Sequence, residues 1–370
     1  MSQQRHKRVI ISGGGTGGHI FPAISVANAL RKIDTEMEIL FVGAEGRMEM
    51  EKIPAAGYRI VGLPVAGIQR RLTLKNITVL VKLFKSLRMA KQVIREFSPD
   101  VVVGVGGYAS GPVLRQAGKM GILTLIQEQN SYAGVTNKLL AKRASTICVA
   151  YDGMEKYFPA DKIIKTGNPV RQNYDNLKSL ESEALGFFNL KKEFPVILVL
   201  GGSLGAGSIN NSLSESINKM RDSDCQLLWQ TGKHYFENVN ALVSLTFSEN
   251  ISVHGFINRM DYAYAAADII VSRAGAGTIS ELCLVGKPVI LIPSPNVAED
   301  HQTRNAMALS DNQAAVLITD NQAIKTLVDE AIKLVSDKKK RDMLSKNILK
   351  MADRDADIRI AKEILKLTDK

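Results

Sequence analysis

Short apolar runs rich in β-branched residues alternate along the chain with longer segments of helical periodicity. In the first half these runs are residues 9–11, 39–42, 101–105, 123–126 and 146–150; in the second half they are residues 196–200, 226–230, 251–253, 269–271, 288–292 and 315–318. Nearly continuous apolar strands that alternate with helices are typical of parallel sheets covered on both faces. The pattern therefore predicts an α/β protein.

The strands fall into two series, and each series opens with a strand followed by a glycine-rich loop. The loops read GGGTGG and GGSLGAGS, and a chain of 370 residues is too long for one hydrophobic core. We therefore expect two doubly wound, Rossmann-like domains with parallel sheets, residues 1–167 and 168–350, and a last helix within residues 351–370. Ligands of such folds bind at the carboxyl ends of the strands, so the glycine loops are expected to face each other across a cleft.

The first glycine loop, SGGGTGGHIFPA, lies where a strand is expected to end and a helix to begin. It matches the GxGxxG fingerprint of dinucleotide-binding proteins, but the second strand ends in Gly43, and Glu45 comes too late to bind a ribose. An NAD(P)-dependent oxidoreductase is therefore the less favoured interpretation. A helix from Pro22 would offer free N–H groups to an anion. His19 can accept a hydroxyl proton, donate to a phosphate, or simply cap the helix.

Three further glycine-rich turns follow strands, at residues 104–112, 201–210 and 272–282. In the last of them Thr278 and Glu281 have the spacing of a capping box, but a glutamate one turn into such a helix can also bind ribose hydroxyls. A dehydrogenase needs one nucleotide loop, whereas a transferase must hold both a donor and an acceptor. The number of loops therefore favours a transferase.

The net charge of +11 adds phosphates, nucleic acid or an anionic membrane surface to the candidate partners. A nucleic-acid-binding protein is the third alternative, and it lacks a recognisable helix-turn-helix, RNP or zinc pattern. Cys148, Cys225 and Cys283 are far apart and without CxxC spacing, which fits reduced thiols in the cytosol. The sequence predicts neither a signal peptide nor a membrane span, so we expect a soluble protein or one held at a membrane surface.

Residues 72–95 predict an amphipathic helix with an unusually wide apolar arc. Its apolar members are Leu74, Ile77, Val79, Leu80, Val81, Leu83, Phe84 and Leu87, bordered by Lys75, Lys82, Lys85 and Arg88. A surface helix usually buries a narrower arc, whereas a wide arc edged by cations is typical of helices at a membrane interface. The alternative is a deeply buried helix whose lysines reach solvent.

Seven motifs between residues 8 and 310 carry a resemblance to a known family. They are GGTGGHIFPA, GGYASGP, QEQNSYAGVTNK, GNPVR, GGSLGA, RAGAGTISEL and EDHQTRNA. In this order and spacing they resemble the MurG family of N-acetylglucosaminyltransferases. The resemblance implies a GT-B fold, in which two Rossmann-like domains face each other across a cleft and a C-terminal helix packs back on the first. It also implies inverting transfer of GlcNAc from UDP-GlcNAc to the C4 hydroxyl of undecaprenyl-pyrophosphoryl-MurNAc-pentapeptide, which converts lipid I to lipid II in peptidoglycan biosynthesis.

The same resemblance implies the residues of the site. Catalytic roles are expected for His19, as the general base or as a contact to the acceptor diphosphate, and for Glu128 and Tyr108 at the acceptor. UDP-GlcNAc would be bound by Thr16, Gly17, Gly18, Asn130, Arg171, Ser203, Ile257, Ala276, Gly277, Thr278, Ile279, Ser280, Glu281 and Gln302. As alternatives, Glu128 braces its loop and Tyr108 is a packing aromatic.

Neither a metal nor a cofactor is expected. Residues 222–224 read DSD, like the metal site of other glycosyltransferases, but they precede a strand and so lie at its amino end. The acidic and histidine residues of EDHQ, at residues 299–302, have no companions with ligand spacing. The helix dipole and backbone amides can carry the charge of a diphosphate instead.

A lipid-linked acceptor implies that the first domain faces the membrane and the second binds UDP-GlcNAc. We expect a peripheral protein on the cytoplasmic face of the inner (plasma) membrane, with no nucleic acid as partner. Docking on the anionic surface would use Ile77, Val81, Lys82, Phe84, Lys85, Leu87 and Arg88, with the apolar members at the headgroup boundary.

Overall fold

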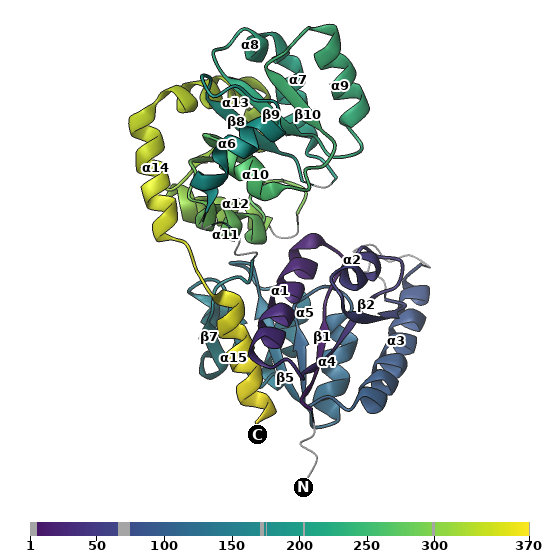
Figure 1. Ribbon diagram of the computed structural model, residues 1–370. Helices are drawn as coiled ribbons and strands as arrows, with labels where there is room; N and C mark the ends of the chain where they lie inside the picture. Colours follow the sequence, from purple (N-terminus) through teal and green to yellow (C-terminus); the bar gives the residue numbers. More distant parts are fainter. Residues whose placement is uncertain are drawn as a thin grey trace. The chain divides into compact units, whose positions relative to one another are not determined.

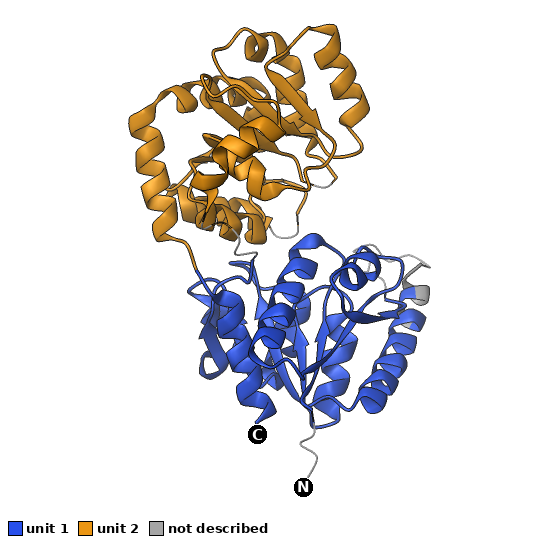
Figure 2. Ribbon diagram, in the orientation of Figure 1, with its two compact units in different colours: residues 1–171, 354–370 blue, residues 172–353 orange. Residues whose placement is uncertain are grey.

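The computed structural model describes residues 6–65, 75–170, 174, 176–202, 204–297 and 300–369; for residues 75–78 and 80 it describes the backbone alone. The chain forms two compact units, Met1–Arg171 with Arg354–Lys370 and Gln172–Asp353 (Figures 1 and 2). The chain passes between the units at residues 171/172 and 353/354, where the sequence pattern places the boundaries at 167/168 and 350/351.

The first unit is built on a parallel sheet whose seven described strands run in the order β3-β2-β1-β4-β5-β6-β7. The strands are β1 (Arg8–Ser12), β2 (Glu38–Ala44), β3 (Arg59–Leu63), β4 (Val101–Gly104), β5 (Leu123–Glu128), β6 (Thr146–Val149) and β7 (Ile163–Lys165). The α-helices are α1 (Gly17–Ile33), α2 (Glu49–Ala55), α3 (Lys75–Phe97), α4 (Ser110–Lys119), α5 (Val135–Leu140) and α15 (Ala356–Thr368). The strand order reverses between β1 and β4, and that switch point is where doubly wound sheets bind ligands.

Alternate residues of β1 enter the two hydrophobic cores on either face of this sheet. Val9 and Ile11 pack into the core that includes residues of α1 and α15, and Ile10 packs into the core that includes residues of α3 and α4. All three side chains are fully buried, which explains why this strand is apolar without alternation.

The C-terminal helix α15 belongs to the first unit, although the whole second unit precedes it in the chain. It lies beside α1 (Figure 1) and buries Ile360, Ala361, Ile364 and Leu367 in the same core. The guanidinium of Arg359 also donates to the carbonyl of Thr166, at 2.7 and 3.1 Å. Apolar packing and hydrogen bonds together hold the last helix on the first unit.

The second unit has a parallel sheet whose six described strands run in the order β10-β9-β8-β11-β12-β13. They are β8 (Val196–Leu200), β9 (Gln226–Gln230), β10 (Ile251–His254), β11 (Ile269–Ser272), β12 (Val289–Leu291) and β13 (Val316–Leu317). The helices are α6 (Leu177–Phe187), α7 (Gly207–Glu215), α8 (Ile217–Arg221), α9 (Phe236–Leu245), α10 (Met260–Ala266), α11 (Ala276–Val285), α12 (His301–Ser310), α13 (Asp320–Ser336) and α14 (Lys338–Lys350). The strand order of this sheet reverses between β8 and β11, which is its switch point. The hydrophobic core of the second unit includes the fully buried Trp229.

Each strand predicted from the apolar runs is present, which confirms the α/β class and the two doubly wound domains. The sequence pattern missed β3 and β7. Both are edge strands, and their side chains are largely half-exposed or exposed, so they lack the continuous apolar signal of the inner strands. None of the described helices is long and apolar enough to span a membrane.

Candidate active site

The first glycine loop connects β1 to α1 at the switch point of the first sheet. Helix α1 begins at Gly17, five residues before the start expected at Pro22, and Thr16 is its N-cap residue. The N–H groups of His19 and Ile20 bond to the carbonyl of Thr16, whose exposed side chain makes no capping bond. The N-terminus of α1, including Gly17 and Gly18, therefore carries the free helix N–H groups that suit an anion.

A buried carboxylate shapes this loop from the side of α2. Glu49 is 1% exposed, and its two oxygens accept hydrogen bonds from the N–H groups of Gly15, at 2.9 Å, and Ala44, at 3.0 Å. Gly14 has φ +149°, and a Cβ there would lie 2.1 Å from an oxygen of Glu49. The loop needs glycine because this carboxylate fills the space that a side chain would take.

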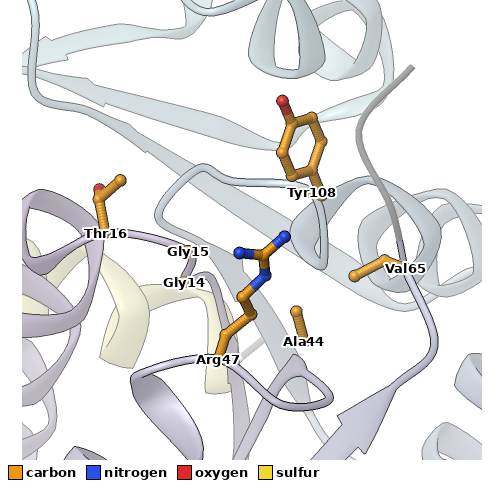
Figure 3. Close-up of a pocket in the computed structure, with 7 residues that line it drawn as sticks. All are labelled: Gly14, Gly15, Thr16, Ala44, Arg47, Val65 and Tyr108. Atoms are coloured by element: carbon orange, nitrogen blue, oxygen red, sulfur yellow. The ribbon is translucent and has the colours of Figure 1, made fainter. Parts of the chain in front are cut away.

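A cavity of about 130 Å³ opens beside the loop (Figure 3). It is lined by Gly14, Gly15, Thr16, Ala44, Arg47, Val65 and Tyr108. Tyr108 is 60% exposed, so it is not a packing aromatic of the core. Arg47 brings a guanidinium to the cavity, and sequence reasoning missed it because its only signal is its place after the carboxyl end of β2.

His19 stands in the first turn of α1 and faces the residues after β5. Its Nδ1 lies 3.2 Å from Oε1 of Gln129. Burial lowers the pKa of His19 below its ordinary value of 6.5, although the charge of Glu128 and the hydrogen bond with Gln129 act in the opposite direction. The imidazole is therefore neutral at pH 7, as a general base must be.

Glu128, at the end of β5, uses both of its oxygens to hold the loop that follows. Oε1 accepts from the backbone N–H and the side-chain amide of Asn130, at 3.1 and 3.2 Å, and Oε2 accepts from the N–H of Gly134 and the amide of Asn137, both at 2.9 Å. The side chain is 2% exposed. This geometry favours the alternative that Glu128 braces its loop and, through it, places Asn130.

In the second unit the N-terminus of α11 offers a second set of free helix N–H groups that suits an anion. Its N-cap is Gly275, so the prediction that Thr278 caps this helix is wrong. Ala276, Gly277 and Thr278 form its first turn, and the hydroxyl of Ser280 donates back to the carbonyl of Ala276 at 3.0 Å. Ile279 is buried, so it supplies packing and backbone.

Glu281 lies in the second turn of α11, next to two tyrosines. The hydroxyl of Tyr174 donates to its Oε1, and that of Tyr264 donates to its Oε2 at 3.3 Å. Burial and the charge of Glu281 raise the pKa of Tyr264 well above its usual value, so this phenol remains a donor. The tyrosines orient the carboxylate at the start of the helix.

Gln302 and Ile257 are the other described donor-site candidates. The Oε1 of Gln302 accepts from the N–H groups of Ser294, at 2.9 Å, and Ala274, at 3.3 Å. Its side-chain NH₂ group is the part that can donate to a ligand. The N–H of Ile257 donates to Oε1 of Gln230 at 2.9 Å. A backbone contact from Ile257 to a base must therefore use its carbonyl oxygen. Arg171 and Ser203 lie outside the described residues.

The DSD segment lies before β9, at the end of the sheet opposite the glycine loops. Asp222 forms an ion pair with Arg221 at 2.7 Å, and both are exposed. Among the described residues no group of three or more His, Cys, Asp or Glu side chains is arranged to hold a metal ion.

Helix α3 has one buried and one exposed face. Ser86, Ala90 and Ile94 are buried, whereas Val81 is 64% and Phe84 72% exposed. Lys82, Lys85 and Arg88 are exposed beside them, Leu87 is half-buried, and the side chain of Ile77 lies outside the described part. The alternative of a deeply buried helix is therefore wrong.

Comparisons with known proteins agree with this architecture. The glycosyltransferase family 28 N-terminal domain matches residues 9–149, and the family 28 C-terminal domain matches residues 196–360. Among solved structures, Acinetobacter baumannii MurG superposes with a TM-score of 0.75 at 26% identity, covering 97% of this chain and 99% of that one. A UDP-GlcNAc 2-epimerase from Neisseria meningitidis bound to UDP-GlcNAc, 15% identical with a TM-score of 0.66 over 97% of this chain and 100% of its own, shares the fold.

Two curated relatives match along their whole length. A protein of Parabacteroides distasonis is 58% identical over 99% of this chain and 100% of its own. One of Bacteroides thetaiotaomicron is 55% identical over 99% of each chain. Both are named UDP-N-acetylglucosamine–N-acetylmuramyl-(pentapeptide) pyrophosphoryl-undecaprenol N-acetylglucosamine transferase. The chain therefore belongs to glycosyltransferase family 28 and, within it, to the family of these N-acetylglucosamine transferases.

Proposed function

We propose that this protein transfers GlcNAc from UDP-GlcNAc to the C4 hydroxyl of undecaprenyl-pyrophosphoryl-MurNAc-pentapeptide, with inversion at the sugar, in peptidoglycan biosynthesis. The observation that carries the proposal is the 58% identity, over 99% of this chain and 100% of the relative, to a transferase named for this donor and acceptor. The geometry of both glycine-loop sites agrees with it, because each offers helix N–H groups to a phosphate.

The second unit binds the donor in this proposal. The first turn of α11, with Ala276 and Gly277, holds the diphosphate through backbone N–H groups and the helix dipole. Glu281, oriented by its tyrosines, accepts from the ribose hydroxyls, and the amide group of Gln302 donates to the sugar. Uracil meets the carbonyl of Ile257, since its N–H is already used. Arg171 and Ser203 keep their expected donor roles as proposals.

The first unit binds the acceptor. The guanidinium of Arg47, beside the first glycine loop, offers a cationic place for the acceptor diphosphate, while Thr16, Gly17 and Gly18 keep their expected contacts with UDP-GlcNAc. Tyr108, exposed in the same cavity, contacts the acceptor, and Asn130, held by Glu128, keeps its expected contact with UDP-GlcNAc. His19 takes the proton of the C4 hydroxyl as its oxygen attacks the anomeric carbon and the bond to UDP breaks. The N-terminus of α11 stabilises the charge on the leaving UDP.

The exposed face of α3 docks the first unit on an anionic membrane, at the cytoplasmic face of the inner membrane, in this proposal. Val81 and Phe84 enter the headgroup boundary, while Lys82, Lys85 and Arg88 attract anionic lipid. Ile77 and Leu87 keep their expected docking roles as proposals. No role for nucleic acid is proposed. A peripheral position suits an acceptor whose undecaprenyl chain stays in the bilayer.

Turnover of UDP-GlcNAc, measured as UDP release with and without the lipid-linked MurNAc-pentapeptide acceptor, tests the function. We expect release that depends on the acceptor and a product enlarged by one GlcNAc. Free UDP-GlcNAc hydrolysis without the acceptor, or binding of a nicotinamide cofactor in place of UDP, would contradict the proposal.

A further inference from the structure

Three buried side-chain amides form a chain that ends on the ring of His19. Gln127 lies in β5, Gln129 follows this strand and Asn168 follows β7; their exposed fractions are 0%, 2% and 2%. The resemblance assigned no role to them. An amide is costly to bury unless its donors and acceptors are paired, so three together in one site indicate a purpose beyond filling the core.

Two backbone carbonyls determine which way each amide points. Nδ2 of Asn168 donates to the carbonyl of Gln129 at 2.9 Å, so its Oδ1 is the atom that accepts from Nε2 of Gln127, at 3.2 Å. Oε1 of Gln127 then accepts from Nε2 of Gln129. That same Nε2 donates to the carbonyl of Val105 at 2.7 Å. A carbonyl can only accept, so both ends of the chain give the same orientation for Gln129.

This orientation determines the proton of His19. With its nitrogen committed to Val105 and Gln127, Gln129 presents its Oε1 to Nδ1 of His19 at 3.2 Å. An amide oxygen accepts, so Nδ1 must carry the single proton of the neutral ring. The other nitrogen, Nε2, then has a lone pair and no proton.

We propose that Asn168, Gln127 and Gln129 are positioning residues that hold neutral His19 as its Nδ1–H tautomer and thereby make Nε2 the proton acceptor of the reaction. The inference rests on the proposed function for the role of His19, while the tautomer exists without substrate. It also decides between the two roles expected for His19, because an unprotonated Nε2 cannot donate to a diphosphate. In the reaction Nε2 receives the hydroxyl proton, the new C–O bond forms at the anomeric carbon, and UDP leaves with the electron pair. The imidazolium keeps its Nδ1–H bond to Gln129.

The tautomer can be read directly from the full-length protein labelled with ¹⁵N at histidine. Long-range ¹H–¹⁵N spectra at pH 7.5 distinguish a protonated from an unprotonated ring nitrogen, and the His19→Ala spectrum identifies which of the five histidines is His19. We expect a single Nδ1–H form. An Nε2–H form in the wild-type protein would overturn the inference without any variant.

Two variants test whether the amide chain is the cause. Gln129→Leu removes the acceptor, and Asn168→Ala frees the far end of the chain without touching the ring. Both are expected to bring the His19 tautomer toward Nε2–H, which a free histidine prefers. They should also lower kcat by about tenfold to a hundredfold, because one buried hydrogen bond favours one tautomer over the other by about this factor. KM for UDP-GlcNAc should not change.

A matched control separates positioning from loss of stability. Gln226→Leu removes another buried glutamine that donates to backbone carbonyls, those of Lys191 and Phe194, in the second unit. It should reduce stability and leave the His19 spectrum as in the wild type. If Gln129→Leu fails to fold, Asn168→Ala and the wild-type spectrum still decide. A pure Nδ1–H form in both folded variants would overturn the amide chain as the cause. Normal turnover of His19→Ala would overturn Nε2 as the proton acceptor and leave the transferase function standing, whereas wild-type enzyme without acceptor-dependent UDP release would contradict the proposed function itself.

Discussion

The chemistry of His19 is determined by its neighbours more than by histidine itself. Burial disfavours the charged ring, and the carboxylate of Glu128 partly offsets this effect. Glu128 in turn is committed to four hydrogen bonds, so it acts on His19 through its charge and not as a second base. Of these two residues, the proposed mechanism therefore uses His19 as the base.

The reaction should become slower at acid pH with the titration of this histidine. The folded pKa of His19 lies below 6.5, so the neutral, active form is fully present above 6.5 and is lost as the pH falls through the lowered pKa. We expect the acid limb of kcat/KM below pH 6.5. His19→Ala should reduce kcat by about 10²–10⁴-fold and abolish that limb, with little change in UDP affinity. A mutant with near-normal turnover at saturating acceptor would leave His19 as a structural residue.

Donor affinity should depend on Glu281. Glu281→Ala is expected to weaken UDP binding by about 1–3 kcal/mol, measured by calorimetry, because ribose hydroxyls lose their acceptor. Tyr264→Phe is the matched control, since it removes a hydroxyl that donates to Glu281 and leaves the carboxylate in place; it should affect UDP binding much less. EDTA should leave this affinity intact. Equal UDP affinity of Glu281→Ala and wild type, or loss with EDTA that Mg²⁺ restores, would contradict the assignment.

Sequence reasoning named the residues whose motifs are local and missed those whose roles depend on distant contacts. His19 follows the glycines that mark its loop, so its place could be predicted. Glu49 meets Gly15 across 34 residues, and Gln129 meets His19 across 110. Nothing in the spacing of a single chain marks such pairs, because they arise only when β1, β2 and β5 come together in the sheet.

At the scale of the element, local signals determined the type of each segment better than its ends. The glycine loop was recognised from the sequence. Its helix, α1, begins at Gly17, directly after the N-cap residue Thr16, and not at Pro22 as expected. Pro22 lies inside the helix and removes a single N–H from it. The early start places His19 in the first helical turn, beside the free N–H groups of the helix N-terminus.

The carboxylate of Glu49 should stabilise the first glycine loop. Glu49→Gln replaces one oxygen with an NH₂ group, which cannot accept from Gly15 or Ala44, so one buried N–H loses its partner. We expect a loss of about 1–3 kcal/mol in the free energy of unfolding by urea. Glu51→Gln, on the same helix but exposed, should have little effect. If the two variants are equally stable, the carboxylate does not hold the loop.

Helix α3 should bind vesicles through its exposed face. Replacing Lys82, Lys85 and Arg88 with glutamate should abolish salt-sensitive sedimentation with anionic vesicles, since each cation contributes roughly 1 kcal/mol near such a surface. Turnover of a lipid-linked acceptor should fall, while turnover of a water-soluble acceptor analogue should hardly change.

The matched control replaces three exposed lysines of α14 in the second unit with glutamate, which changes the net charge equally. They are Lys338, Lys339 and Lys346. This control should still sediment with the vesicles. Unchanged sedimentation of the α3 variant would place the contact elsewhere on the protein.

At the scale of the whole molecule, the parallel sheets and their order follow from the apolar runs, because inner strands buried on both faces carry the strongest signal. The assignment of the last helix does not follow in this way. Its apolar face fits any core of suitable shape; in the structure its contacts with α1 and β4 and the hydrogen bonds of Arg359 to Thr166 assign it to the first unit. The first unit is therefore completed by residues 354–370, which come last in the chain.

This arrangement predicts which half of the protein a C-terminal substitution destabilises. Ile364 is fully buried in the core shared with α1, so Ile364→Ala should cost about 2–5 kcal/mol and lower hydrogen-exchange protection in β1 and α1. Protection in β8 and β11 of the second unit should stay near that of the wild type. Ile290→Ala, an equally buried substitution in β12, should give the reverse pattern. If Ile364→Ala lowers protection in the second unit and leaves β1 and α1 unaffected, α15 stabilises the second unit and the prediction is wrong.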